Sequence, residues 1–500
     1  MKKQLDQFKT MLAEVADLGS ASAVLGWDQE AYMPKGGAES RGQILGTLQR
    51  LSHERFTSKE TGAMIEKLEG MAGDLDPDSD DARLIKVCRR EYDKNVKVPA
   101  AMVAEQAEIT SLATQAWQEA RAESDFSKFE PHLEKVLEWT RRYAEIFAPY
   151  DHIYDPLIDS YEPGMKTTDV QAIFNDIRPQ QVEIIQAVAG KEQVDDSMLW
   201  QDFPEANQFA FGREVMTAFG FDWDRGREDK TTHPFSTNFG FGDQRITVRV
   251  DEKFFNSYLF AALHETGHAL YEQGVPKSLS RTPLYGGTSL AVHESQSRMW
   301  ENNVGRSLPF WKHFYSKLQH QFPDQLKQTS VDDFYKAINK VYPSFIRVEA
   351  DEATYNLHIM LRLELEIALL EGKIAVKDMP AAWNEKFHEY LGITPENDAE
   401  GCLQDVHWSF GLFGYFSTYA LGNLVSAQLW EVIEKEIPDI DAKMENGEFD
   451  PLLSWLVENI HQHGSKFEPQ ELIQRVTGET INGDAYIRYL NKKFGAIYGL

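Results

Sequence analysis

The stretch YLFAALHETGHALYEQ at residues 258–273 places His264 and His268 four residues apart. On a helix these two imidazoles project from one face, with an offset of about 6 Å at roughly 1.5 Å of rise per residue. Glu265 lies beside the pair. Apolar residues surround these three side chains and predict a mostly buried helix, where polar groups with nothing to bind are costly. The stretch therefore predicts a helix with a chemical role.

Signals on both sides give the expected bounds of this helix. Asp251 is a favourable N-cap residue, so the helix is expected to begin after it. It is expected to end near Gln273, because Gly274 can adopt the left-handed conformation that stops a helix and Pro276 cannot continue one. The helix that carries the two histidines is thus expected between Asp251 and Gln273.

A strand is predicted immediately before the helix, at residues 243–250. Polar residues occupy the odd positions, while Ile246, Val248 and Val250 share the other face. This period of two is typical of a half-buried strand. A small β element with a polar face is therefore expected beside the helix.

Two imidazoles at this spacing suit two ligands of one tetrahedral metal ion. Glu265 is placed to act as the general base that takes a proton from the attacking water. The alternative is that His264 and His268 are core histidines bonded to nearby carbonyl groups. We interpret the pattern as the metal site of a metallopeptidase.

A third metal ligand must come from further along the chain. The elongated metzincin pattern requires a histidine at position 274, where this chain has Gly274. A second helix is predicted over residues 288–304, and Glu294 on it is the expected third ligand. Glu294 is chosen over His293 because two histidines and one carboxylate leave a fourth position open for water. Glu301 is the competing carboxylate.

Most of the remaining sequence has the periodicity of helices, and strand patterns are scarce. A chain of 500 residues with 42% hydrophobic residues can bury one very large core or two fused lobes. No repeat or long flexible linker separates independent parts. We therefore expect a mainly α protein with a single domain over residues 1–500, in which a helical portion of about 1–200 precedes the catalytic motifs at 233–415.

Composition and charge exclude several classes of partner. The formal charge of −28 spreads along the chain and would repel phosphate backbones and anionic lipids, so neither nucleic acid nor membrane is expected. No secretory-signal pattern is present at the start. Cys88 and Cys402 lie far apart without a partner motif, which fits a reduced, cytoplasmic location.

Six motifs, in order, resemble the signature set of the carboxypeptidase Taq family of metallocarboxypeptidases. The resemblance runs through nearly the whole chain, including Trp27-Asp28 and Gly392-Ile393-Thr394-Pro395. The motifs are His233-Pro234-Phe235, Asp243-x-Arg245-x-Thr247, the HExxH at His264, His293-Glu294-Ser295-Gln296, Ile346-Arg347-x-x-Ala350-Asp351 and Gly401-x-x-Gln404-Asp405-x-His407-Trp408.

The resemblance implies an almost all-helical protein with a deep groove, similar to neurolysin and angiotensin-converting enzyme, that pairs as a homodimer. It also implies removal of single residues from peptide C-termini with broad side-chain tolerance. The metal implied is zinc or, in some members, cobalt.

Further residues are expected to contact the substrate. His407 and Tyr415 are candidates to stabilise the oxyanion, as a similar pair does in related helical peptidases; the alternative is that both belong to the core. A free C-terminal carboxylate is best bound by an arginine fork. Arg347 is the first candidate, although it could pair with Asp351 on a shared helix, and Arg245 on the predicted strand is the second.

Two other functions remain open at this point. An endo-oligopeptidase could use the same metal site and would release internal fragments first. A non-catalytic peptide-binding scaffold is disfavoured, because such a protein does not need Glu265.

Overall fold

Helices make up most of the protein, as predicted, in a computed structural model that describes residues 1–500. The chain forms two compact units. The first comprises Met1–Val96, Asp195–Ile338 and Leu429–Gly478, and the second comprises Lys97–Val194, Asn339–Gln428 and Glu479–Leu500. The single domain expected over residues 1–500 stays a prediction.

The first unit holds the predicted metal helix. Its α-helices are α1 (Lys2–Ala31), α2 (Ala38–Phe56), α3 (Lys59–Glu69), α4 (Asp80–Lys97), α9 (Glu205–Ala218), α10 (Phe255–Gly274), α11 (Leu290–Arg298), α12 (Leu308–Gln321), α13 (Pro323–Leu326), α14 (Val331–Ile338), α18 (Ile440–Glu445), α19 (Asp450–Asn459) and α20 (Pro469–Thr477). The helix α17 (Ser417–Glu436) begins in the second unit and ends in the first.

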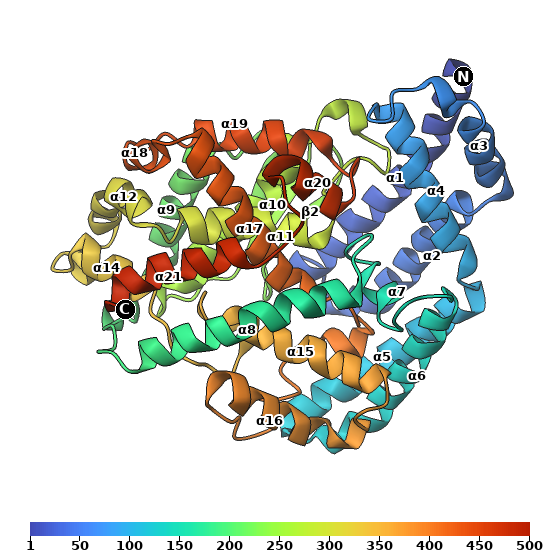
Figure 1. Ribbon diagram of the computed structural model, residues 1–500. Coiled ribbons are helices and arrows are strands. Elements are labelled where there is room, and N and C mark those ends of the chain that lie inside the picture. Colours follow the sequence, from blue (N-terminus) through green and yellow to red (C-terminus); the bar gives the residue numbers. More distant parts are fainter. The chain divides into compact units, whose positions relative to one another are not determined.

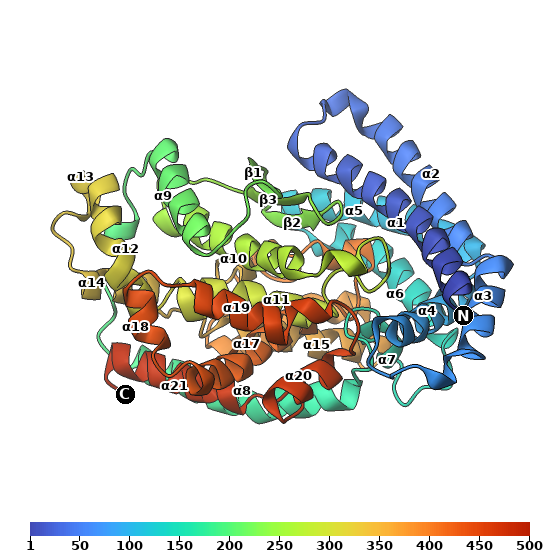
Figure 2. The ribbon, with the colours of Figure 1, turned by 90° about the horizontal axis from the view of Figure 1, so that it is seen from above.

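A three-stranded sheet lies beside α10, as Figure 2 shows. Its strands are β1 (Gly226–Lys230), β2 (Phe235–Asn238) and β3 (Gln244–Val248), in the order β1-β3-β2. β1 is parallel to β3, whereas β2 is antiparallel to it. Ile246 and Val248 are buried, as the alternation predicts, but Thr247 is buried as well because its hydroxyl bonds to Phe235 and Thr231.

The helix α10 begins three residues later than predicted. Asp251 does not cap it but accepts a hydrogen bond from the Lys253 N–H in the turn before it, and the N-cap residue is Phe254. The C-terminal end at Gly274 agrees with the predicted position, but the predicted left-handed conformation of Gly274 is wrong: Gly274 is the last helical residue, and Val275 after it is extended. The helix is apolar on several sides because it lies between the sheet, α9 and α11.

The second predicted helix is divided. An α-helical part, α11, is capped by the Ser289 hydroxyl, and a π-helical turn over Met299–Val304 continues it. π-helical turns inside α-helices occur frequently at functional sites. Glu294 lies on the α-helical part and Glu301 on the π-helical part.

The second unit is built from α5 (Ala100–Glu123), α6 (Glu130–Glu145), α7 (Asp155–Ile158), α8 (Thr167–Ala189), α15 (Tyr355–Leu370), α16 (Met379–Leu391) and α21 (Asp484–Tyr498). Figure 1 shows α8 running alongside α15 and α21. Nearly all of α15 is buried, including Arg362 and Glu366. Two charged residues inside a buried helix need compensating partners.

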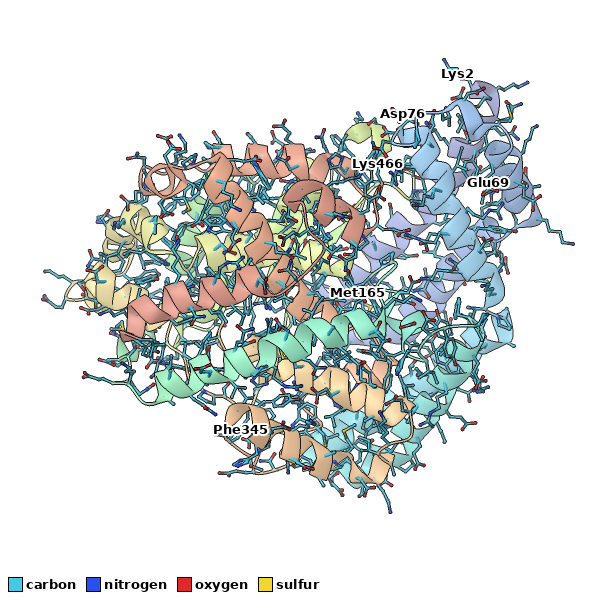
Figure 3. All side chains as sticks on the ribbon, viewed as in Figure 1. Lys2, Glu69, Asp76, Met165, Phe345 and Lys466 are labelled. Atoms are coloured by element: carbon cyan, nitrogen blue, oxygen red, sulfur yellow. The ribbon has the colours of Figure 1, made fainter.

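The surface carries the excess negative charge in the form of solvated side chains, such as Glu69 and Asp76 in Figure 3. No helix combines the length and the apolar character required to cross a membrane.

Candidate functional site

Three predicted metal ligands come together in the first unit. His264 and His268 project from α10 with their ring centroids 5.0 Å apart. The Nε2 atom of each lies 3.4 Å from the same carboxylate oxygen, Oε2 of Glu294 on α11. The structure thus brings two residues of one helix and one of the next to a common point.

A glycine allows the two helices to approach each other closely. A Cβ atom on Gly267 would lie 2.5 Å from the carbonyl oxygen of Gln296 and 2.6 Å from the Cα of Ser297. No side chain fits there, so only glycine permits this contact between α10 and α11. Gly267, between Glu265 and His268 in the sequence, therefore places Glu294 within reach of both histidines.

The other nitrogen of His264 has its own partner. Its Nδ1 lies 3.0 Å from Oε2 of Glu301, which is fixed in turn by Arg298 and Arg306. Arg298 also donates to Oε1 of Glu294 at 2.8 Å. Glu301, the competing ligand in the sequence, is therefore placed on the outer side of the imidazole.

His268 is fixed by a chain of hydrogen bonds. Its Nδ1 lies 2.7 Å from Nδ1 of His293, whose Nε2 lies 2.9 Å from Oε1 of Glu272. Asn238 on β2 donates to the other oxygen of Glu272. His293 therefore does not face the common point but orients one of the residues that do.

These three side chains fit a divalent metal ion. Their ligand atoms all lie within 4.8 Å of one another. In a tetrahedral shell with bonds of about 2.0–2.2 Å, ligand atoms are about 3.3–3.6 Å apart, close to the 3.4 Å found between each Nε2 and Glu294. Both Nδ1 atoms are occupied by outer partners, which leaves the Nε2 atoms for the ion.

The charges around Glu294 keep its carboxylate ionised. Burial alone would raise its pKa, but Arg298, His264 and His268 together hold the pKa well below its usual range. An ionised carboxylate is the form that binds a cation.

Glu265 differs from its neighbours because its carboxylate has no partner. It is buried, and none of the hydrogen bonds or ion pairs of the protein involves it. Burial raises the pKa of Glu265 to about 7. A carboxyl group that is free of partners and more basic than usual is suited to accept a proton.

The second unit contains the first candidate for the carboxylate anchor. Arg347 is buried in a 3-10 turn, Arg347–Glu349, and donates from Nε and Nη2 to Oδ1 of Asp405 at 3.0 and 2.7 Å. Its Nη1 donates to the Tyr355 hydroxyl at 3.0 Å. The alternative pairing with Asp351 on a shared helix is wrong: Asp351 lies before α15 and accepts hydrogen bonds from Thr354.

Arg245, the second candidate, lies in the first unit on β3. Its guanidinium stacks over Trp27 and Phe239, with its carbon 4.6 and 5.1 Å from the two ring centroids. Asp243 accepts from its Nε and Nη2. Arg245 is therefore held in one orientation by an aromatic pair and by the carboxylate of the residue that precedes its strand.

His407 and Tyr415 lie together in the second unit, with ring centroids 5.4 Å apart. Burial lowers the pKa of His407 to about 3, so its imidazole is neutral. Tyr419, which the sequence motifs do not include, completes the group: its hydroxyl lies 3.4 Å from Nε2 of His407. In the sequence, the only indication of a role for Tyr419 is its spacing of four residues from Tyr415.

The hydrogen-bonded chain behind His268 leads to a first prediction. A ligand histidine is held by the partner of its other nitrogen, and loss of such a partner costs about 10- to 100-fold in metal affinity. His293→Phe is therefore expected to weaken zinc binding by that factor. His293→Gln should retain most of the affinity, because its amide can accept from His268 and donate to Glu272.

Competition with a coloured chelator measures the affinity of both variants directly. Equal zinc affinity in wild type and His293→Phe would reject the role of His293, and thermal unfolding of the metal-free proteins controls for general damage.

Comparisons with known proteins agree with this geometry. Residues 7–494 match the sequence profile of the family described as carboxypeptidase Taq (M32) metallopeptidase. The chain is 43% identical over 496 residues to thermostable carboxypeptidase 1 of Thermus thermophilus, covering 97% of both chains, and 40% identical to carboxypeptidase 1 of Bacillus subtilis, covering 98% of both. A crystal structure of an M32 carboxypeptidase from Deinococcus radiodurans superimposes with a TM-score of 0.96 at 39% identity, covering 100% of both chains.

Proposed function

Because the chain belongs to the carboxypeptidase Taq (M32) family and is therefore a metallocarboxypeptidase, we propose that it releases single residues from peptide C-termini through the site on α10 and α11. The observation that carries the proposal is the meeting of His264, His268 and Glu294 beside the unpartnered carboxylate of Glu265. We propose broad side-chain tolerance, in keeping with the resemblance.

We propose zinc as the ion, with cobalt as the alternative. Two imidazoles and one carboxylate are typical of catalytic zinc sites, in which the fourth position stays open. A metal held there supplies Lewis-acid activation of water and of the scissile carbonyl group. Elemental analysis of the purified protein tests the identity of the ion.

The proposed proton transfers belong to Glu265. Its carboxylate takes a proton from the attacking water and gives that proton to the amine that leaves, so that the base is regenerated at the end of each cycle. The pKa of about 7 suits both steps, because the group can accept and release a proton near neutral pH.

We propose His407 and Tyr415 as hydrogen-bond donors to the developing oxyanion. The phenol of Tyr415 is a donor, and His407 is neutral, so one of its nitrogens carries a hydrogen. Removal of one preorganised donor of this kind typically lowers kcat by about 100- to 1,000-fold.

The anchor for the substrate carboxylate is proposed to be Arg347, with Arg245 second. Arg347 and Arg362 share the single carboxylate of Asp405, so one of the two positive charges lacks an aspartate partner of its own. Arg245 is more accessible, but Asp243 already occupies two of its donors.

A carboxypeptidase is expected to lose activity when the C-terminus of its peptide is amidated. The amide removes a charge-assisted contact worth about 1.5–3 kcal/mol, which is about 10- to 100-fold in rate. N-terminal acetylation should have little effect. Free, acetylated and amidated versions of one peptide, incubated with the metal-loaded enzyme and followed by mass spectrometry, give the comparison.

The products separate the alternatives. Stepwise loss of single residues from the free and acetylated peptides supports the proposal, whereas internal cuts in all three peptides indicate an endo-oligopeptidase. Arg347→Ala and Arg245→Ala then assign the anchor, because the variant that lacks the true anchor no longer distinguishes the free peptide from the amidated one. Family membership argues against the non-catalytic scaffold.

Other expectations from the sequence stay predictions. These are the pairing as a homodimer, the cytoplasmic location, the absence of nucleic-acid and membrane partners, and the likeness to neurolysin and angiotensin-converting enzyme with a deep groove. Light scattering in solution measures the oligomeric state directly.

A further inference from the structure

A stripe of buried polar side chains follows one face of α15 in the second unit. Tyr355, His358, Arg362 and Glu366 are three or four residues apart along the helix, so they share a face. All four are buried. Partners usually compensate a buried polar group for the loss of water, and Tyr355, Arg362 and Glu366 have such partners, whereas the ring nitrogens of His358 have none. The partners of this stripe show what it holds in place.

Glu366 accepts three hydrogen bonds, and two of them come from one loop. Its Oε1 accepts from the indole Nε1 of Trp408 at 2.9 Å. Its Oε2 accepts from the backbone N–H of Gly414 at 3.0 Å and from the hydroxyl of Tyr154 at 2.6 Å. One carboxylate therefore bridges two points of the segment 405–415.

The same helix holds the beginning of that segment. Arg362 donates from Nε to Oδ2 of Asp405 at 2.7 Å. Asp405 and Trp408 flank His407 on both sides, and Gly414 directly precedes Tyr415. His407 thus lies between two residues that bond to α15, and Tyr415 directly follows a third.

The backbone at Gly414 leaves no room for adjustment. Its φ of 92° lies in the region that favours glycine, and a Cβ there would lie 2.6 Å from the carbonyl carbon of Leu157. Gly414 therefore fits between the end of α7 and the carboxylate of Glu366. Tyr415, the next residue, also packs its ring against Tyr161 at 5.1 Å.

The surroundings of Glu366 combine buried charges with buried neutral groups. Arg347 and Arg362 carry two positive charges, while burial lowers the pKa values of His358 and His407 and keeps both neutral. Both arginines bond to Asp405, and Glu366 is a second buried carboxylate on the same helix as Arg362. Burial raises the pKa of Glu366 to about 7, even though hydrogen bonds from Tyr154, Gly414 and Trp408 and the charge of Arg362 act to lower it.

We propose that Glu366 is a positioning residue, which fixes His407 and Tyr415 for the oxyanion by bonding to Trp408 and Gly414. The inference rests on the proposed function, which gives the donor role to those two residues. Glu366 belongs to none of the six sequence motifs.

Glu366→Gln is the direct test. The glutamine has an NH₂ group in place of one carboxylate oxygen. That NH₂ faces the N–H of either Trp408 or Gly414, so one of these two hydrogen bonds is lost because both groups are donors. We expect kcat to fall by about 10- to 100-fold with KM within about threefold, since part of a donor contribution of about 100- to 1,000-fold is lost. Hydrogen–deuterium exchange of segment 405–415 should become faster, with unchanged metal content.

Two further variants separate positioning from charge balance and from general damage. Glu366→Asp keeps the charge but is too short to bridge Trp408 and Gly414, so it should not restore kcat or the slow exchange. Glu364→Gln changes the same residue type on the same helix, where the carboxylate bonds to Arg178 and Tyr390 instead. It should leave both kcat and the exchange of segment 405–415 as in wild type.

The outcomes distinguish this inference from the proposed function. Wild-type kcat and exchange in Glu366→Gln, or full rescue by Glu366→Asp, would overturn the positioning role. When His407 is already replaced by alanine, Glu366→Gln should lower kcat little further, because the effects of substitutions at residues that act as a unit are not additive. Wild-type kcat in both His407→Ala and Tyr415→Phe would instead reject the donor assignment, while faster exchange in Glu366→Gln would still show that Glu366 holds the segment.

Discussion

Replacing Glu265 with glutamine is expected to lower kcat/KM for peptide hydrolysis by about 100- to 10,000-fold and to leave the metal content unchanged. Glutamine keeps the shape of the side chain but cannot accept a proton. Glu265 is absent from the group of three side chains whose ligand atoms converge. The variant should therefore separate loss of the base from loss of the ion. Elemental analysis gives the metal content, and initial rates on the same sample give the activity.

Stability provides the control for this variant. The carboxylate of Glu265 is buried without a hydrogen-bond partner, so a neutral amide of equal size should not destabilise the fold. We expect the metal-free variant to unfold at the same or a higher temperature than metal-free wild type. Substantial hydrolysis by fully metal-loaded Glu265→Gln would remove Glu265 from the role of general base.

The central part of the site could be predicted because it depends on local periodicity. A spacing of four places His264 and His268 on one helix face in any helical fold. The prediction of Glu294 required one further step, namely a second helix that returns toward the first after a loop. Gly267 then fixes the distance between the helices, and its requirement for glycine becomes visible only when the backbone of Gln296 is seen beside it.

The partners of the site residues could not be predicted, because they depend on side-chain directions between distant segments. Asp405, the partner of Arg347, lies 58 residues away, whereas the nearby Asp351 bonds within its own turn. The π-helical turn that places Glu301 against His264 has no sequence signal of its own. His293 and Glu294 are neighbours in sequence with different roles, which the spacing of residues alone cannot separate.

β1 was not expected for a related reason. Its sequence, GREDK, lacks the alternation of a half-buried strand, yet Glu228 and Asp229 are both buried. Arg213 and Tyr258 bond to the carboxylate of Glu228, which compensates for its burial. A strand stabilised by ion pairs from other elements has no hydrophobic pattern to reveal it.

Replacing Glu294 with alanine is expected to abolish stoichiometric metal binding, and His264→Ala and His268→Ala should do the same. Each variant removes one of the three donors, and the remaining two cannot complete the coordination shell. Elemental analysis after dialysis gives the metal content per chain, and chelator competition gives the affinity.

Glu301→Ala is the matched control, because Glu301 is the other buried glutamate that contacts His264. It contacts Nδ1, whereas Glu294 contacts Nε2, so its loss should weaken binding by about 10- to 100-fold without emptying a site supplied with excess zinc. Arg298 bonds to both glutamates and keeps one partner in either variant, so an unpaired arginine does not explain a difference between them. If Glu301→Ala were empty and Glu294→Ala retained a full equivalent of metal, the two assignments would have to be exchanged, and the ion would lie on the Nδ1 side of His264.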